Sequence, residues 1–551
     1  MESLARDLNE MQRQPLAASH VRRIRAAGTE RTWKAGEMVQ RVGDPADVFI
    51  YVTEGEVEVL DPLTGENELG ATLGATQFIG EITFLQGGRW YLDMRAVQDT
   101  TGIVVERKRM LDLMREVPEM SDHIITVFAA RRRRTLESGD TALTIVGAEE
   151  DRNLRRIAAF AGRNRIPVRS YALGSAEAAQ MAEGCGAAPG TPFAVFGKDH
   201  LIKDPSPRAV ASLLGIDLSI HRDDVDVLIV GGGPAGVSAG VYAGAEGLSA
   251  LVVEDLTIGG QAGTSSRIEN YMGFPTGISG ADLCWRGEVQ AMKFGTRFAV
   301  PRRAAGIEKR GDGRFCVTLE DGDVVCAKAV VIATGVQYRK LPIDRLEHFE
   351  GAGIYYAATD VEARFCRGQE VAVIGGGNSA GQAAMFLSRS TKHVHVLVRG
   401  ESLADSMSDY LLSRLEKDPA ITIHYCTEMT ALHGEETLEA ITIRDRSTGD
   451  DWKLNTRAVF VMVGAAPNTD WLGDCVQQDS KGFVCTGLQA GAQRSFETNV
   501  PGIFAVGDLR AGSVKRVASS VGEGSVVISQ VWDYLENDAP AYDTDEPVAA
   551  E

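Results

Sequence analysis

The chain has 551 residues, of which 44% are hydrophobic, and a formal net charge of −19. This length allows roughly three or four domains with sizeable cores, and the negative charge disfavours nucleic acid and anionic membranes as partners. No apolar run approaches the ~20 residues of a membrane span, and the first residues lack the apolar segment of a signal peptide, so we expect an acidic multidomain protein of the cytoplasm.

Residues 1–138 carry many short strand signals separated by glycine turns. Asp47–Val52 runs into a turn at Gly55, and Glu56–Leu60 then alternates as a half-exposed strand does. Further short strands continue to about Glu106, and one helix is predicted from Arg109 through Leu136. This pattern predicts a β jelly-roll-like barrel.

Three stretches of this segment, Gly43–Asp47, Glu54–Val57 and Phe78–Ile82, resemble the cyclic nucleotide-binding domain. The resemblance implies that Gly80 and Glu81 open a phosphate-binding cassette, with Glu81 accepting a hydrogen bond from a ribose hydroxyl. Arg89 stands near the place of the family's phosphate-clamping arginine, but the surrounding segment differs from the family's Pro-Arg-Ala-Ser/Thr. A barrel that senses another ligand, or that serves dimerisation, therefore stays open beside cyclic nucleotide binding.

A run of four arginines, Arg131 to Arg134, follows in the predicted helix. An anion-binding patch is one interpretation. We favour a solvated helix end, because most such runs are solvated.

Residues 139–217 alternate strand and helix signals. We predict strands at Ala142–Val146, Val168–Leu173 and Phe193–Phe196, and helices at Arg152–Asn164, at Ala176–Glu183 and ending near Leu214. This order, with Pro192 before a strand, resembles the thioredoxin fold, whose cis-proline faces a dithiol. No cysteine follows the first strand, so we interpret the segment as a docking or structural element without thiol chemistry.

The clearest motif begins at Val227, where four apolar residues lead into Gly231-x-Gly233-x-x-Gly236 and a small-residue helix. The first glycine permits a sharp turn, the second a close approach to pyrophosphate, and the third close packing of helix on strand. The helix N-terminus offers free N–H groups to the phosphates. A second strand ends in Glu254, where a carboxylate suits a ribose diol, so the stretch predicts a dinucleotide site.

Further motifs in chain order resemble the thioredoxin reductase family of FAD- and NAD(P)H-dependent flavoproteins: Gly259–Thr264, Ile268–Pro275, Val330–Gly335 and Pro501–Asp508. The helix start at Lys515–Ala518 is placed to stabilise charge on a flavin. Together the motif and the resemblance imply an FAD site formed by Gly231, Gly233, Pro234, Ala235, Gly236, Glu254, Gly260, Gln261, Asn270, Ala333, Thr334, Gly335, Gly507, Asp508, Lys515, Arg516, Val517 and Ala518.

A second dinucleotide motif, Gly375-x-Gly377-x-x-Ala380, lies between these FAD segments and includes Asn378 and Ser379. The strand after it ends in Arg399 rather than in an acid. A guanidinium attracts a 2′-phosphate and a carboxylate repels it, so NADPH is favoured over NADH. The family's further arginines are missing, since Gly400 and Ala404 stand where they are expected.

The family's redox dithiol is missing. Thioredoxin reductases carry Cys-Ala-Thr-Cys before the second dinucleotide motif, and here Ala357 and Asp360 replace the cysteines; a gapless register substitutes Ala358 and Val361. Alanine cannot form a thiolate or a mixed disulfide, so we expect no ordinary thioredoxin reduction. Hydride transfer from the nicotinamide to the flavin depends on positioning, so we expect that it needs no protein acid or base.

The eight cysteines are scattered, and no two of them form a Cys-x-x-Cys. This favours reduced thiols over disulfides, and it predicts no metal site.

The predicted organisation is multidomain, with a jelly-roll barrel, a thioredoxin-like α/β domain and two Rossmann-type α/β domains. The domains are 1–138, 139–217, a discontinuous FAD domain at 222–345 and 464–540, an NAD(P)H domain at 346–463, and an acidic tail at 541–551. We expect a homodimer that is an oxidoreductase with an unidentified acceptor. A non-enzymatic redox sensor and a disulfide reductase acting through Cys366 are the alternatives.

Overall fold

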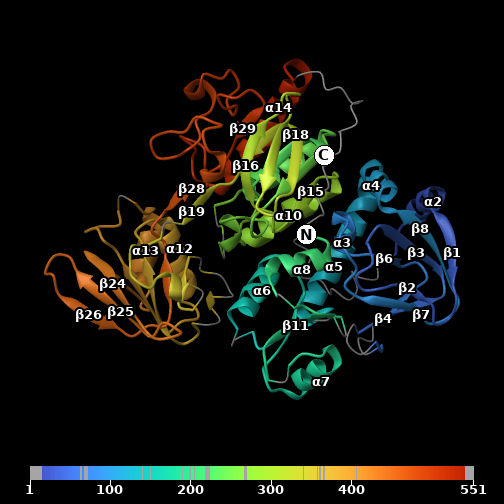
Figure 1. The fold of residues 1–551 in the computed structure, drawn as a ribbon, viewed down its shortest axis with the longest axis horizontal. Helices are drawn as coiled ribbons and strands as arrows, with labels where there is room; N and C mark the ends of the chain where they lie inside the picture. The colour runs from blue at the N-terminus through green and yellow to red at the C-terminus, as the bar shows by residue number, and fades with distance from the viewer. Residues whose placement is uncertain are drawn as a thin grey trace.

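The computed structural model describes residues 15–539 except 62–64, 68–71, 139–140, 149–150, 189, 198–199, 204, 217–223, 266–267, 269, 339, 351, 357, 359–361, 364–365 and 405. It divides into a barrel unit, a middle unit, a first dinucleotide unit and an inserted dinucleotide unit. Figure 1 shows the barrel unit and the inserted unit at opposite ends, with the other two units between them. Within the described residues, no helix combines the length and apolarity needed to cross a bilayer.

The barrel unit consists of two four-stranded antiparallel sheets and the helices that follow them. The first sheet has the order β1 (Thr29–Trp33), β8 (Thr100–Glu106), β3 (Val48–Glu54), β6 (Phe78–Ile79). The second has the order β2 (Met38–Gln40), β7 (Asp93–Ala96), β4 (Glu56–Leu60), β5 (Thr72–Gly74). The helices are α2 (Ala18–Ala27), α3 (Ile82–Gln86), α4 (Arg107–Glu116) and α5 (Pro118–Ser138).

The prediction of one helix from Arg109 through Leu136 is wrong, because the chain breaks between α4 and α5. Val117 has φ −131° and ψ 83°, outside the helical region. The ring of Pro118 disfavours a helical conformation at the residue before it, while a proline is tolerated in a first helical turn. The two helices therefore pack separately beneath the sheets.

The middle unit follows the strand and helix order that the sequence predicts. Its elements are β9 (Leu143–Val146), α6 (Arg152–Arg163), β10 (Arg169–Tyr171), α7 (Ala176–Cys185), β11 (Phe193–Phe196), β12 (His200–Leu201) and α8 (Pro207–Leu214). The sheet order is β10-β9-β11-β12, with β10 parallel to β9 and β11 antiparallel to it. Among the described residues the cis peptide precedes Pro301, and the bond before Pro192 is trans, unlike the cis-proline of the thioredoxin fold.

The first dinucleotide unit is built on a seven-stranded sheet. Its elements are β13 (Asp224–Val230), α9 (Pro234–Ala245), β14 (Ala250–Val253), η2 (Ala262–Thr264), α10 (Gly280–Lys293), β15 (Arg297–Ala299), β16 (Ala304–Lys309), β17 (Phe315–Leu319), β18 (Val324–Ile332), η4 (Asp470–Leu472), η5 (Gly487–Ala490), β29 (Ile503–Ala505) and α14 (Val517–Asn537). β14, β13, β18 and β29 are parallel neighbours, so their carboxyl ends share one edge.

The inserted unit is a second parallel sheet, ordered β20 (Ile354–Tyr355), β27 (Val459–Val461), β21 (Glu370–Ile374), β22 (His393–Leu397), β23 (Ile421–His424). It also contains η3 (Glu347–Phe349), α12 (Asn378–Leu387), α13 (Asp409–Lys417), β24 (Thr427–His433), β25 (Ala440–Asp445) and β26 (Asp451–Leu454). The chain enters along β19 (Val336–Tyr338) and returns along β28 (Ala465–Pro467), and these two strands pair antiparallel.

One hydrophobic cluster joins the barrel unit to the first dinucleotide unit. It contains Phe84 and Phe128 of the barrel helices together with Val289 and Met292 of α10, all at most 6% exposed. Burying these side chains in a single core holds the two units as one packed body.

The prediction that all cysteines are reduced is wrong for one pair. Cys316 and Cys326 form a disulfide with a Cα–Cα distance of 4.1 Å. They are ten positions apart in the sequence, but β17 and β18 form a hairpin in which the two residues lie directly opposite each other. Sequence spacing alone does not reveal a cross-strand pair, because the register of the hairpin brings the two sulfurs together.

Candidate functional site

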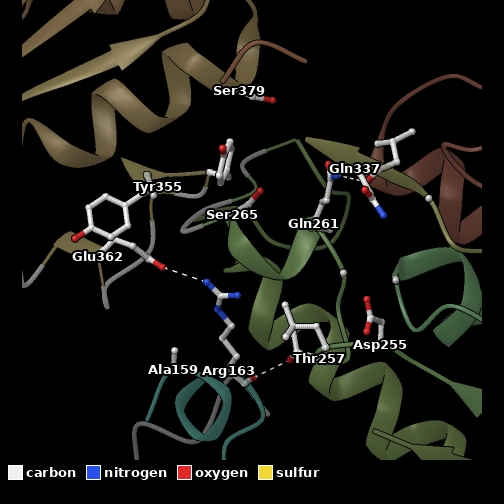
Figure 2. A pocket seen from close by; sticks show the side chains of 18 of the residues that line it. Ala159, Arg163, Asp255, Thr257, Gln261, Ser265, Gln337, Tyr355, Glu362 and Ser379 are labelled. Atoms are coloured by element: carbon white, nitrogen blue, oxygen red, sulfur yellow. Dashed lines mark hydrogen bonds and ion pairs between the residues drawn. The ribbon is translucent and has the colours of Figure 1, made fainter. Parts of the chain in front are cut away.

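A single cavity of about 2530 Å³ lies where the first dinucleotide unit, the inserted unit and the middle unit meet. Its wall on the first unit is formed by the carboxyl edge of the parallel strands, where this class of sheet binds nucleotides. Figure 2 shows this region with Gln261 and Gln337 on one side, Tyr355 and Glu362 on another, and Arg163 and Ala159 on a third. The cavity exceeds the 300–1,000 Å³ or so of a pocket for one drug-sized ligand.

The three glycines of the first motif act as the sequence analysis expects of their geometry. Gly231 has φ +111°, and a Cβ there would lie 2.3 Å from the carbonyl oxygen of Ala333. A Cβ on Gly236 would lie 1.8 Å from the carbonyl oxygen of Gly231. At Gly233 nothing lies within 4 Å of the Cβ position, so the backbone there opens onto the cavity, beside the N-terminus of α9.

The structure brings the predicted FAD residues together, with Gly236 as the exception because it packs beneath the turn. Those that line the cavity are Gly231, Gly233, Pro234, Ala235, Glu254, Gly260, Gln261, Asn270, Ala333, Thr334, Gly335, Gly507, Asp508, Lys515, Arg516, Val517 and Ala518. They come from segments up to about 290 residues apart (231 to 518) and converge because the strands before them are neighbours in one sheet.

Two carboxylates in this wall suit a hydroxyl-rich ligand. The Oδ1 atom of Asp508 is buried and has no hydrogen-bond partner among the described residues, and burial raises the pKa of this carboxyl. Glu254 accepts hydrogen bonds from the N–H of Gly232 at 2.7 Å and of Leu256 at 3.1 Å, and burial raises its pKa too. Each oxygen keeps a lone pair for another donor, so these residues fit the ribose and ribityl hydroxyls of FAD.

The helix start at Lys515–Ala518 also faces the cavity. α14 begins at Val517, and all four residues of this segment line the cavity wall. The N-terminus of a 21-residue helix carries a partial positive charge. The Lys515 ammonium donates to the carbonyl oxygen of Asp508 at 3.3 Å and adds a full charge beside it.

The predicted NADPH residues divide into two groups. Asn378 and Ser379, at the N-terminus of α12, line the same cavity, whereas Gly375, Gly377, Ala380 and Arg399 do not. Gly375 has φ +145° and packs against the carbonyl of Met462, so it forms the turn. Arg399 is exposed after β22, and its carbonyl accepts a hydrogen bond from Arg446.

The positions that replace the dithiol, Ala357 and Asp360, lie outside the described residues, as does Val361. Nearby Cys366 is 1% exposed, and its thiol donates to the carbonyl of Glu362 at 3.1 Å. Burial raises the pKa of Cys366 to about 12. A thiol in this state is not a nucleophile at neutral pH, which argues against a disulfide reductase acting through Cys366.

Sequence reasoning missed the wall that the middle unit contributes. Arg155, Arg156 and Arg163 of α6 line the cavity, and Arg163 pairs with Glu362 of the inserted unit at 3.3 Å. Asn164 and Thr257 add hydrogen bonds between the middle unit and the first dinucleotide unit. The helical spacing of the basic residues was the available signal, but nothing local shows which unit a helix faces.

In the barrel unit, the residues proposed to bind a cyclic nucleotide already make contacts with other residues of the protein. Glu81 accepts from the N–H of Thr83 at 2.7 Å and pairs with Arg132 at 2.6 Å. Arg89 donates to the carbonyl of Gly43 at 2.7 Å, and a Cβ on Gly80 would lie 2.6 Å from the ring of Phe128. The Oε2 atom of Glu81 therefore accepts from two nitrogens of Arg132, while Oε1 accepts from one donor.

The interpretation of Arg131 to Arg134 as a solvated helix end is wrong for its first half. Arg131 donates to the carbonyls of Phe78 and Gly80, and Arg132 is 8% exposed and contacts Glu81 and Thr83. This face of α5 packs against the barrel rather than facing solvent. Arg131 and Arg132 therefore hydrogen-bond α5 to the segment that contains Glu81.

Two family profiles match the chain. The profile of the pyridine nucleotide-disulphide oxidoreductases covers residues 225–524, and that of the cyclic nucleotide-binding domain covers residues 30–117. The chain is 33% identical over 326 residues to the thioredoxin reductase of Streptomyces clavuligerus, a match that covers 59% of this chain and 98% of that protein. It is 35% identical over 313 residues to the thioredoxin reductase of Treponema pallidum, covering 57% and 98%.

A solved structure agrees with these matches. The crystal structure of thioredoxin reductase from Lactococcus lactis superposes with a TM-score of 0.52 at 29% identity, covering 57% of this chain and 99% of that one.

Proposed function

The chain belongs to the pyridine nucleotide-disulphide oxidoreductase family, and we propose that it passes electrons from NADPH through FAD to an acceptor other than thioredoxin, without a redox dithiol of its own. It is an NAD(P)H-dependent flavoprotein oxidoreductase of the thioredoxin reductase-like type with an N-terminal cyclic nucleotide-binding-type domain. One observation carries the proposal: both dinucleotide motifs open onto one cavity, and none of the described residues that line it is a cysteine.

When bound, FAD would supply the two-electron chemistry that links the nicotinamide to the acceptor. The chain's own residues bind and orient. The open backbone at Gly233 and the N-terminus of α9 hold the pyrophosphate, Glu254 and Asp508 hold hydroxyl groups, and the start of α14 stabilises negative charge. Binding both cofactors in one cavity would supply the rate by proximity.

The test is an anaerobic titration of the purified protein with NADPH. The visible flavin absorption band should bleach, and added oxidised thioredoxin should stay oxidised. A protein without flavin colour, or a flavin that neither NADPH nor NADH reduces, refutes the proposal. Rapid thioredoxin reduction refutes its second half.

The preference for NADPH rests on Arg399. Arg399 is exposed and follows β22, at the strand end where the adenosine ribose of a dinucleotide, with its 2′-hydroxyl or 2′-phosphate, is recognised. Arg399→Ala should raise KM for NADPH about tenfold, because it removes a charge-assisted contact, and should leave KM for NADH unchanged. Equal changes for both cofactors would contradict the assignment.

We assign the two sheets of the barrel unit to a jelly roll and the middle unit to a thioredoxin-like fold; their strand orders support both assignments. The domains follow as 1–138, 139–217, 222–345 with 464–540, and 346–463. The antiparallel pair of β19 and β28 is the hinge between the two dinucleotide domains. The protein forms a homodimer, which light scattering at low concentration tests.

The barrel unit supports the oxidoreductase units as a structural brace and is not a cyclic nucleotide receptor. Arg132 of α5 donates to the carbonyl of Arg165 at 3.1 Å, Arg165 pairs with Asp282 of α10, and Arg163 pairs with Glu362 at 3.3 Å. A continuous set of contacts thus runs from the barrel to the inserted unit. Repeating the NADPH titration with cyclic AMP and cyclic GMP should give identical curves, and a changed rate with either would overturn this role.

A further inference from the structure

The middle unit places a basic wall on the cavity. Arg155, Arg156 and Arg163 of α6 all line it, and Arg163 is paired with Glu362. Neither Arg155 nor Arg156 forms an ion pair or a side-chain hydrogen bond with any residue that the structure describes, and the Nε atom of Arg155 is buried without a partner. The wall therefore keeps two guanidinium groups for a ligand.

An unpaired guanidinium beside a cavity is costly unless something satisfies it. A buried N–H without an acceptor is destabilising, and low-dielectric walls concentrate the field of such charges. This occurs in a chain whose net charge is −19, so the positive wall is a local feature. An anionic ligand would provide both the missing acceptor and the missing charge.

The position of the wall indicates what that ligand does. The same cavity is lined by Gln261 on the predicted flavin side and by Ser379 on the nicotinamide side. Tyr355 lies close enough to Arg155 to feel its charge, and burial raises the pKa of Tyr355, so its ring stays a neutral phenol. The guanidinium can pair with a planar anion, and the neutral ring of Tyr355 offers an apolar surface beside it for the rest of such a ligand.

The chemistry of the cavity narrows the class of acceptor. Disulfide exchange needs an attacking thiolate, and none of the described residues in the cavity lining is a cysteine. A conjugated dicarbonyl needs no protein thiol, because it takes up two electrons directly.

We propose that Arg155 and Arg156 bind an anionic quinone as the electron acceptor of this enzyme. This assignment rests on the proposed function. The quinone (Q) gains a hydride equivalent that originates on NADPH and a proton from solvent, so the overall reaction is NADPH + H⁺ + Q → NADP⁺ + QH₂.

The probes are 2-hydroxy-1,4-naphthoquinone, which is an anion at neutral pH, and its neutral 2-methoxy analogue. Dissociation constants are measured by calorimetry on the oxidised, flavin-loaded protein without NADPH, and kcat/KM is measured with NADPH. The variants are Arg155→Ala, Arg156→Ala and the charge-retaining Arg155→Lys. Arg389→Ala is the control, since Arg389 is exposed on the inserted unit and does not line the cavity.

Arg155→Ala should weaken binding of the anion and lower its kcat/KM by roughly 10- to 100-fold, the loss of one charge-assisted hydrogen bond. The neutral analogue should change less than about threefold, Arg155→Lys should keep most of the anion selectivity, and Arg389→Ala should match the wild type. Arg156→Ala, at an exposed position, gives the same test without a risk to folding.

Equal effects on both quinones, or no effect on either, overturn the proposal. A rise in KM for NADPH with unchanged acceptor selectivity also overturns it, since the arginines then hold the dinucleotide phosphates. If NADPH bleaches the flavin but the wild type neither binds nor reduces the anion, this inference fails while the proposed function stands. Absence of flavin bleaching is the separate failure of the proposed function.

Discussion

The cavity wall of the first dinucleotide unit and the cassette of the barrel unit both carry ligand-binding motifs, yet the structure leaves their polar atoms in different states. In the former, Asp508 keeps a buried oxygen without a partner and Gly233 opens onto free space. In the latter, Glu81 is paired with Arg132 and Arg89 is bonded to Gly43. A motif remains a binding site only where the rest of the fold leaves its polar atoms available.

The largest expected effect comes from filling the glycine turn beneath the cavity wall that the predicted FAD residues form, which we call the flavin wall. In Gly236→Ala, the new Cβ would lie 1.8 Å from the carbonyl oxygen of Gly231, so the turn must shift and the pyrophosphate cradle is lost. We expect the purified variant to contain less than about a tenth of the wild-type flavin, measured by absorbance after gel filtration.

The matched control is Gly522→Ala in α14, where nothing lies within 4 Å of the Cβ position. That variant should retain its flavin and gain up to ~1 kcal/mol in stability from helix propensity. Normal flavin content in Gly236→Ala would show that the wall tolerates a shifted turn.

The second effect concerns the pair that occupies the barrel cassette. Arg132→Ala leaves the half-buried carboxylate of Glu81 without its charged partner, and breaking a buried pair in this way costs about 3–5 kcal/mol. We expect the thermal midpoint of the barrel unit to fall accordingly, as followed by scanning calorimetry. Lys108→Ala, at an exposed position of α4, should change stability by less than about 0.5 kcal/mol. Equal stability of the two variants would mean that the pair contributes little.

A third variant, Asp508→Ala, tests the unpaired oxygen of the flavin wall. Loss of one ionic hydrogen-bond acceptor should weaken FAD binding by about 1.5–3 kcal/mol, measured by titrating the flavin-free protein. The stability of the flavin-free protein should fall by less than the loss in FAD affinity, because the buried Oδ1 atom has no partner to lose and the carboxylate gives up only its contacts with Ser520 and Lys515. Asp474→Ala, an exposed acid in the same unit, is the control. A destabilised flavin-free variant with unchanged FAD affinity would reverse this interpretation.

The smallest effect lies at the junction of the two regions. Burial raises the pKa of Glu288 on α10 to about 7, against the opposing charges of Arg165 and Arg132. The folded state therefore binds more protons than the unfolded state between the ordinary pKa of 4.5 and about 7, so stability falls as pH rises through this window.

Glu288→Gln should remove that dependence, which we expect to be of the order of 1–3 kcal/mol. Thermal midpoints at pH values below and above the window measure it. Glu246→Gln, at an exposed position of the first unit, should keep the wild-type slope. A wild-type midpoint that rises across the window would contradict the direction.

The glycine turn at Gly231 could be predicted because its motif is local. A strand, a glycine turn and a helix start lie within about ten residues around Gly231, and each glycine is required by contacts inside that stretch. The strand at Phe193–Phe196 and the helix beginning at Arg152 were likewise found in the structure as the sequence predicts them.

The wrong prediction of a single helix through Leu136 was local, because it neglected the effect of Pro118. The remaining errors arose where the deciding contact is distant in the chain, as for the disulfide of Cys316 with Cys326, which depends on a hairpin register. The roles of Arg132, Arg155 and Arg163 depend on which unit each helix faces, and hydrophobic periodicity does not show that.

By itself the sequence determined the α/β dinucleotide units, the order of their nucleotide motifs and the absence of a dithiol, since these properties belong to short stretches whose backbone geometry and chemistry are local. Only the tertiary structure decided that arginines of α6 line the cavity, that Arg132 forms an ion pair with Glu81, and that the Oδ1 atom of Asp508 has no partner among the described residues. Those outcomes depend on pairing charges and burying surfaces between segments far apart in the chain, and pairing of that kind is settled only when the units pack.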